Sequence, residues 1–195
     1  MRVPAVLGHT LRDAPTSAPY LKADASLTRQ WKNQLAAYQG LKIGIHWRVG
    51  HQQGIAALRN VPLDELAKLR ELPRVQLFSL QKGPEAEAVR HFPEIVDLGR
   101  ELDEKTGAFV ETAAVLMNLD LLITCDSAIG HVAGALGTPV WLALHSPCDW
   151  RWAQSGDTTV WYPSMRLFRQ AAPGDWSSVM EEIAAAIGAL QPHGG

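Results

Sequence analysis

The chain contains few of the residues that mark several common classes of protein. Its 195 residues include only two cysteines, Cys125 and Cys148, which excludes a disulfide framework. Eighteen basic and twenty acidic side chains give a net charge of −2, so no positive excess points to nucleic acid or an anionic membrane. The start, Met1-Arg2-Val3-Pro4, lacks the apolar core of a signal peptide. These absences predict a cytoplasmic protein that binds a small ligand.

The sequence also lacks a long apolar run. The longest such stretch, Val132–Leu144, is interrupted by Gly134, Gly137 and Pro139, so no membrane span is expected. Apolar residues make up 47% and charged residues 19% of the chain, as in ordinary globular proteins. The length suffices for one sizeable core but is too short for two full Rossmann-type domains.

Several catalytic and binding motifs are missing as well. There is no GxGxxG, no Walker A sequence and no GxSxG, which argues against a dinucleotide site, a P-loop and a serine nucleophile. Four potential ligands, His46, Cys125, Asp126 and His145, could lie near neighbouring strand ends. They show neither HxxxH nor CxxC spacing, so we expect no metal and no cofactor.

What the sequence does contain is an alternation of strands and helices after residue 40. The expected strands are Lys42–Trp47, Val75–Leu80, Ile95–Leu98, Leu121–Cys125, Val140–Leu144 and Met165–Phe168. The expected helices are Leu63–Glu71, Glu85–Arg90, Ala108–Met117, Ile129–Leu136 and Trp176–Leu190, the last capped by Asp175. Near-continuous apolar strands with helical crossovers predict an α/β fold with a doubly wound, mainly parallel six-stranded sheet of order 3-2-1-4-5-6.

The first forty residues have a different character. Residues 1–23 carry three prolines and little periodicity, which predicts an extended connector. A helix follows, capped near Asp24 or Ser26 and ended by Gly40. We therefore predict a connector and helix over residues 1–40 and a Rossmann-like domain over residues 41–195.

The turn after the fourth strand is the most informative segment. Strand Leu121–Cys125 runs directly into Asp126-Ser127, and small residues up to Gly137 let the next helix lie close to the sheet. Its first-turn N–H groups would then point into the ligand crevice and suit a diphosphate, with His131 one turn further on. Alternatively, Asp126 or Ser127 simply caps the helix and His131 is an interior histidine. From the residues alone, both interpretations stay open.

The loop after the first strand also suits an anion. It carries Arg48, Gly50, His51 and Arg59, and Lys82 follows the neighbouring second strand. Arg59 or Lys82 could stabilise a departing diphosphate, although any one of these cations could equally be a solvated surface residue.

Tryptophan is frequent in the last third of the chain. Trp141, Trp150, Trp152, Trp161 and Trp176 lie there, which suggests a broad aromatic surface that packs on a partner domain, lines a sugar site or supports a homo-oligomer.

These residues resemble a known family. The run from Val96 to Trp141, with its DLG turn and its DSAIGHVAGALG segment, resembles the donor-binding half of heptosyltransferase-like glycosyltransferases. The stretches SLQKG (residues 79–83), DWRW (149–152) and WYPSMRLFRQ (161–170) are similar to the glycosyltransferase-like region of bacterial tetratricopeptide-repeat proteins. The resemblance extends over essentially the whole chain.

The resemblance implies one half of a GT-B fold that binds a nucleotide-diphosphate sugar for inverting, metal-independent glycosyl transfer. It implies a hexosyl- or heptosyltransferase that needs an N-terminal acceptor domain, or a repeat domain as partner. Its expected catalytic residues are Arg59 and His131. Its expected donor-binding residues are Gly50, His51, Gln81, Lys82, Asp97, Gly99, Asp126, Ser127, Ala128 and Ile129.

Two departures from the family leave other functions open. The first-strand loop lacks the acidic residue that the relatives carry there. The half that supplies the acceptor site and general base is not part of these residues, and the proline-rich start resembles its tail. The alternatives are a degenerate nucleotide-binding or interaction module, and a related activity such as nucleotide-sugar epimerisation or hydrolysis.

Overall fold

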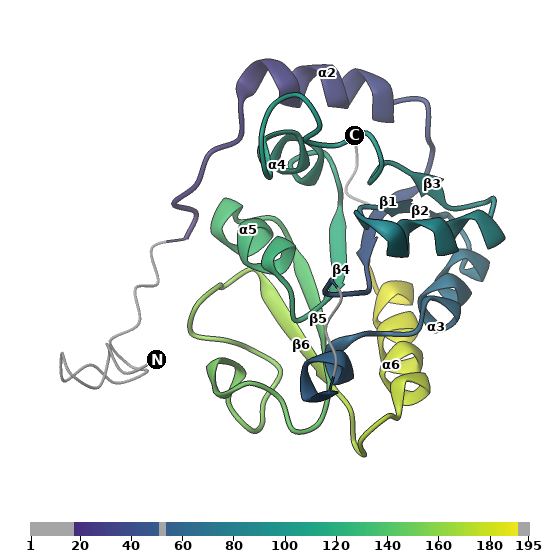
Figure 1. Cartoon of the computed structure of the whole chain (residues 1–195), viewed down its shortest axis with the longest axis vertical. Coiled ribbons are helices and arrows are strands. Elements are labelled where there is room, and N and C mark those ends of the chain that lie inside the picture. Colours follow the sequence, from purple (N-terminus) through teal and green to yellow (C-terminus); the bar gives the residue numbers. More distant parts are fainter. Residues whose placement is uncertain (1–17, 51–53, 191–195) are drawn as a thin grey trace, which may run out of the picture.

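The protein is described by a computed structural model that covers residues 18–50 and 54–190. Its centre is a six-stranded parallel sheet of order β3-β2-β1-β4-β5-β6 (Figure 1). The strands are β1 (Leu41–His46), β2 (Val75–Ser79), β3 (Val96–Asp97), β4 (Leu121–Cys125), β5 (Val140–Leu144) and β6 (Met165–Arg169). The predicted fold class and strand order are therefore confirmed.

Helices cover both faces of the sheet, as the apolar strands require. The α-helices are α2 (Ala25–Leu35), α3 (Leu63–Ala67), α4 (Val110–Leu116), α5 (Ala128–Leu136) and α6 (Trp176–Gly188). Figure 1 shows α3 and α6 on one face and α2, α4 and α5 on the other. Strands β4 and β5 are buried at every position, which explains why their predicted bounds agree with the structure.

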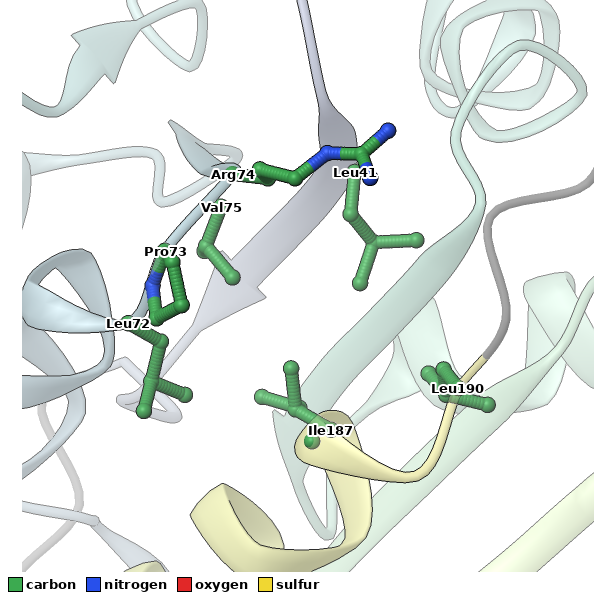
Figure 2. A pocket seen from close by; sticks show the side chains of 8 residues that line it. Leu41, Leu72, Pro73, Arg74, Val75, Ile187 and Leu190 are labelled. Carbon is green, nitrogen blue, oxygen red and sulfur yellow. The ribbon is translucent and has the colours of Figure 1, made fainter.

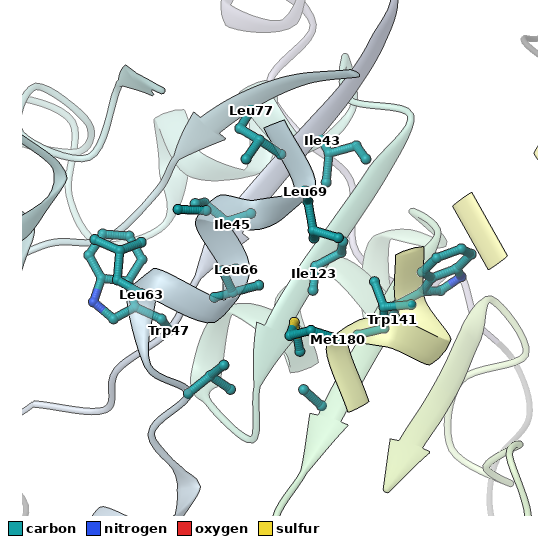
Figure 3. Close-up of a cluster of buried hydrophobic side chains, with 14 of the residues drawn as sticks. Ile43, Ile45, Trp47, Leu63, Leu66, Leu69, Leu77, Ile123, Trp141 and Met180 are labelled. Atoms are coloured by element: carbon teal, nitrogen blue, oxygen red, sulfur yellow. The ribbon is translucent and has the colours of Figure 1, made fainter. Parts of the chain in front are cut away.

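Two apolar cores lie against the two faces. One joins Ile45 and Ile123 of the sheet to Leu66 of α3 and Met180 of α6 (Figure 3). The other packs α2, α4 and α5 onto the opposite face, with Trp31 and Leu122 among its members. The burial of both faces positions the strand ends, and with them the loops that follow.

Helix ends follow the sequence in part. Asp24 caps α2 by accepting hydrogen bonds from the N–H groups of Ser26 and Leu27, and Asp175 caps α6 through Ser178. The prediction that Gly40 ends the first helix is wrong, since α2 ends at Leu35. Gly40 instead adopts a φ of 87° before β1, where a Cβ atom would meet the Arg74 carbonyl oxygen at 2.3 Å.

Within the described residues, four segments form 3₁₀-helices, which the sequence did not distinguish. They are η2 (Gly54–Arg59), η3 (Lys68–Glu71), η4 (Pro84–His91) and η5 (Trp150–Trp152). Two of them replace predicted α-helix: η3 continues α3, and η4 takes the place of Glu85–Arg90. The prolines at 84 and 93 confine η4 to a short connector, where the tighter helix is common.

The predicted aromatic surface is absent from the part of the chain that the structure describes. Trp141, Trp152 and Trp176 are buried in the cores, Trp161 is half-buried and only Trp150 is largely exposed. Clustering in the sequence did not reveal which strand or helix face each ring occupies. Three of these five tryptophans therefore serve the packing of the C-terminal third.

The segment before β1 packs on the sheet domain. The N–H groups of Tyr20 and Leu21 donate to the Ala135 carbonyl oxygen, and the Asn118 side chain donates to the Thr28 carbonyl oxygen. The division at residue 40 stays a prediction.

The outer strands of the sheet are β3 on one side and β6 on the other. Strand β3 contributes two residues, and an isolated antiparallel bridge joins Thr158 to Arg166 beside β6. Within residues 18–50 and 54–190, no helix has the length and apolarity that crossing a membrane requires.

Candidate functional site

The carboxyl ends of β1, β2 and β4 open onto a cavity of about 250 Å³. In open α/β sheets, ligands bind in the crevice outside this edge, near the point where strand order reverses, which here lies between β1 and β4. The cavity is lined by His46, Arg48, Val49, Gly50, Leu80, Gln81, Lys82, Phe109, Thr112, Ser127, Ala128 and Ile129. Six of the predicted donor-binding residues are thus brought together: Gly50, Gln81, Lys82, Ser127, Ala128 and Ile129.

The turn between β4 and α5 presents the start of a helix to this cavity. Ser127 is the N-cap residue of α5, but its side chain makes no capping hydrogen bond. Its Oγ lies 3.0 Å from Oγ1 of Thr124 and 3.2 Å from Nδ1 of His46. The Ser127 hydroxyl therefore does not occupy the first-turn N–H groups, and the positive end of the helix dipole faces the cavity.

His46 forms part of the cavity wall at the end of β1. Burial lowers the pKa of its imidazole to about 4, so the ring is neutral at neutral pH. It contacts Ser127 and, at 3.9 Å from Nδ1, the sulfur of Cys125. From the sequence, His46 is a candidate only as a metal ligand. Its contact with Ser127 depends on the pairing of β1 with β4.

Arg59 and Asp126 meet beside the cavity. Nη1 of Arg59 lies 4.0 Å from Oδ2 of Asp126, and Asp126 is only 2% exposed. Among the described residues, Oδ2 of Asp126 has no hydrogen-bond partner. A buried carboxylate oxygen without a donor is costly, so it is available to a ligand hydroxyl.

His131 has partners inside the protein. Its Nδ1 lies 3.1 Å from the Tyr162 hydroxyl, and its ring stacks on Trp152 with centroids 5.3 Å apart. Burial lowers the pKa of His131, while the Asp126 carboxylate acts in the opposite direction. His131 does not line the cavity, and its catalytic role stays a prediction.

His145 is a second buried histidine at this edge. It follows β5 directly, it is buried, and its Nδ1 has no hydrogen-bond partner in the described part of the chain. Burial lowers its pKa, and Asp126 raises it. From the sequence, His145 is a candidate only as a metal ligand without supporting spacing, although its place right after a buried strand is a signal of the ligand edge.

Two of the predicted donor-binding residues, Gln81 and Gly99, shape the backbone around the cavity. Oε1 of the buried Gln81 side chain accepts from the N–H groups of Trp47 and Arg48, while its Nε2 donates to the carbonyl oxygens of Arg48 and Lys82. A Cβ atom at Gly99 would lie 2.0 Å from the Gln81 carbonyl oxygen. Gln81 holds the start of the first-strand loop, and Gly99 permits the close approach of the next loop.

The remaining predicted residues lie around the rim. Lys82 contacts the Leu102 carbonyl oxygen and forms an ion pair with Glu104 at 2.9 Å, and Asp97 pairs with Arg100 at 2.6 Å. Gly50 adopts a φ of 36° at the cavity wall. His51 lies outside the described residues. In the described ranges, no cluster of three or more His, Cys, Asp or Glu side chains could hold a metal ion.

A second cavity, of about 200 Å³, lies at the other end of the strands, where β1 and β2 begin. Leu41, Leu72, Val75 and Ile187 surround it with mostly apolar groups, and Arg74 lies at its rim (Figure 2). It holds none of the predicted site residues and lies at the amino ends of β1 and β2. The carboxyl edge therefore remains the candidate site.

The part of the chain that matches a known family includes residues of this carboxyl edge. Residues 65–154 match the model of Glycosyltransferase family 9 (heptosyltransferase). The match includes Gln81, Lys82 and the β4–α5 turn but begins after Arg59. It therefore leaves out the first-strand loop, the segment in which the sequence departs from its relatives.

Solved glycosyltransferases share the fold. The chain superposes on the ADP-heptose LPS heptosyltransferase II of E. coli with a TM-score of 0.57 at 16% identity, over 85% of this chain and 52% of that one. The E. coli heptosyltransferase WaaC, solved with ADP-2-deoxy-2-fluoro heptose, gives a TM-score of 0.55 at 14% identity over 95% and 52%. A glycosyl transferase family 9 structure from Veillonella parvula gives 0.58 at 16% over 87% and 52%. The fold is thus that of a Rossmann-like domain of GT-B glycosyltransferases.

A curated relative is the protein FlbA of Caulobacter vibrioides. It is 27% identical over 185 residues, which represent 89% of this chain and 29% of FlbA. The chain thus spans about half the length of the solved heptosyltransferases and less than a third of FlbA.

Proposed function

We propose that this chain binds a nucleoside-diphosphate sugar at the carboxyl edge of its sheet and provides the donor half of a glycosyl transfer. The observation that carries the proposal is the start of α5, which faces the cavity without a side-chain cap. Free N–H groups and the positive end of the helix dipole together form an anion site. The family match over the same turn supports a diphosphate as the anion.

The charges around the cavity support a sugar next to that diphosphate. Arg59 contributes a cation near Asp126, and the Asp126 Oδ2 atom, which no described residue hydrogen-bonds, offers an acceptor for a sugar hydroxyl. The cavity of about 250 Å³ is small for a whole nucleotide sugar, since typical ligand pockets measure roughly 300–1,000 Å³. We infer that the glycosyl group extends out of the cavity past Asp126.

Transfer further requires an acceptor site and a general base. We propose that both come from a second GT-B half or a partner domain, because the chain covers about half of each solved heptosyltransferase. The reaction would be inverting and metal-independent, with a hexosyl or heptosyl donor. A tetratricopeptide-repeat protein remains the proposed context.

Removing one main-chain N–H group at the start of α5 tests the diphosphate site. Ala128 is the first residue of α5 and is exposed, and proline is well tolerated at that position. Ala128→Pro removes one N–H group while keeping the helix, whereas Ala128→Ser keeps the N–H group. Hydrogen bonds to charged groups contribute about 1.5–3 kcal/mol, so we expect Ala128→Pro to weaken ADP binding at least roughly tenfold by calorimetry.

The outcomes separate the candidate functions. No binding of adenosine, uridine, guanosine or cytidine diphosphate at millimolar concentration would favour a degenerate interaction module. Equal affinities of the Pro and Ser variants would remove the helix start from the site. If the diphosphate binds, turnover measured with a supplied acceptor half distinguishes transfer from epimerisation or hydrolysis, because only transfer yields a glycosylated acceptor.

A further inference from the structure

Phe109 is an aromatic residue for which the fold itself has no evident use. It is 38% exposed, it lines the cavity at the carboxyl edge, and it belongs to neither apolar core. Its backbone is left-handed, with φ 65° and ψ 7°. That conformation is unfavourable for a bulky side chain, and residues held in it are enriched at functional sites.

Phe109 also occupies a position that normally belongs to another kind of residue. It is the N-cap of α4, where serine, threonine, aspartate or asparagine usually accepts a hydrogen bond. Here Asp103 performs that task from outside the helix, because its Oδ1 accepts from the N–H groups of Glu111 and Thr112 at 2.7 and 3.0 Å. Glu111 in turn accepts from the Asp103 N–H group. Since the cap is supplied by Asp103, position 109 can hold an aromatic ring at the cavity.

The surroundings of the ring suit a flat aromatic ligand. Leu80 and Ile129, both buried, contribute apolar side chains to the same cavity as Phe109. The start of α5 at Ser127 and Ala128 lies on the wall of that cavity as well. An apolar part with an exposed ring and a polar part at a helix start match the two ends of a nucleoside diphosphate.

We propose that Phe109 is the stacking platform for the nucleobase of the donor, and that it favours a purine over a pyrimidine. This inference rests on the proposed function, because it assigns the base end of the same nucleotide. Stacking on an aromatic side chain tolerates every base, and the larger purine ring covers more of the phenyl face.

The test compares Phe109→Gly, Phe109→Trp and the control Met117→Ala. Met117 is the exposed C-cap residue of α4 and does not line the cavity. Calorimetry measures the affinity of each protein for ADP, for UDP and for pyrophosphate, which lacks a base. Phe109→Gly should lower the affinity for ADP roughly tenfold, reduce the preference for ADP over UDP and leave the affinity for pyrophosphate unchanged. Phe109→Trp should retain ADP binding, and Met117→Ala should resemble the parent.

Stability distinguishes this role from a structural one. Glycine adopts a φ of 65° without strain, so Phe109→Gly should unfold at the same or a higher urea concentration than the parent while binding ADP less tightly. If Phe109→Gly binds ADP as tightly as the parent, or if the parent binds pyrophosphate as tightly as ADP, the stacking role is overturned and the diphosphate site stands. A parent protein that binds neither ligand overturns both proposals.

Discussion

Arg59 and Asp126 face each other at the carboxyl edge of the sheet, with 4.0 Å between Nη1 of Arg59 and Oδ2 of Asp126. The separation is too long for a hydrogen bond, and the carboxylate oxygen stays without a donor in the described part of the chain. The two charged groups therefore attract each other without forming a hydrogen bond. A ligand hydroxyl between or beside them would complete the arrangement.

Replacing Asp126 by asparagine tests this arrangement. Asp126→Asn keeps the shape but removes the charge that faces Arg59, so the free energy of unfolding should be unchanged or lower. The affinity for a nucleoside-diphosphate sugar should fall roughly tenfold relative to the parent, while that for the nucleoside diphosphate alone should be retained. The control is Asp157→Asn, which removes an exposed carboxylate paired with Arg166. Equal losses for both ligands would contradict a sugar contact at Asp126.

His46 should make stability depend on pH. The pKa of His46 is about 4 in the folded protein and 6.5 when unfolded, so between these values the unfolded state binds the extra proton. The free energy of unfolding should therefore fall as the pH drops from 7 to 4, by on the order of 3 kcal/mol from this residue. Urea titrations of His46→Gln should show a flatter pH dependence than the parent. His91→Gln removes an exposed histidine and should keep the slope of the parent.

Gln81 should matter more for folding than for contact with a ligand. Gln81→Ala leaves the N–H groups of Trp47 and Arg48 without an acceptor, which should cost about 2–4 kcal/mol in urea unfolding. Gln76→Ala is the matched control, because Gln76 only donates to carbonyl oxygens near the surface and should cost less than about 1 kcal/mol. Equal costs for the two variants would contradict the supporting role of Gln81.

Gly134 lets α5 approach the loop that carries Tyr162. A Cβ atom at Gly134 would lie 2.5 Å from the Tyr162 ring, so Gly134→Ala should destabilise the protein by about 1–3 kcal/mol. Gly188→Ala is the control, since no atom lies within 4 Å of its Cβ position at the end of α6. It should be neutral or stabilise the helix by up to about 1 kcal/mol. Thermal unfolding of both variants checks the contrast, and a neutral Gly134→Ala would show that the ring can move aside.

The sheet could be predicted from the sequence because its strands are apolar on both faces. The bounds of β4 and β5 agree with the structure for this reason, and the strand order is a common one for doubly wound sheets of alternating strands and helices. Helix type was less accessible, since the 3₁₀-helix η4 shares its composition with a short α-helix. Gly40 was misassigned because a glycine after a helix and a glycine before a strand look alike in sequence.

The site could be located but not resolved in detail. Because ligands bind at the carboxyl ends of parallel strands, Ser127, Ala128 and Ile129 are expected at the ligand site, and they line the cavity in the structure. This rule did not indicate the contact of His46 with Ser127, which depends on the pairing between β1 and β4. Nothing in the sequence indicated that Phe109 reaches the cavity, and His145 was placed near a strand end only as a metal ligand. Their surroundings are created by segments far apart in the chain.

The shortness of β3 has a consequence for how such a domain exists beside other folded units. A sheet edge of only two residues offers few free N–H and carbonyl groups to an incoming strand. At the other edge, Thr158 forms a bridge to Arg166 of β6, which carries an exposed charged side chain. Copies of the domain that meet in a crowded cell or a concentrated preparation should therefore not pair their sheets edge to edge. The fold can be duplicated, fused or tethered without turning its own sheet into a seed for fibres.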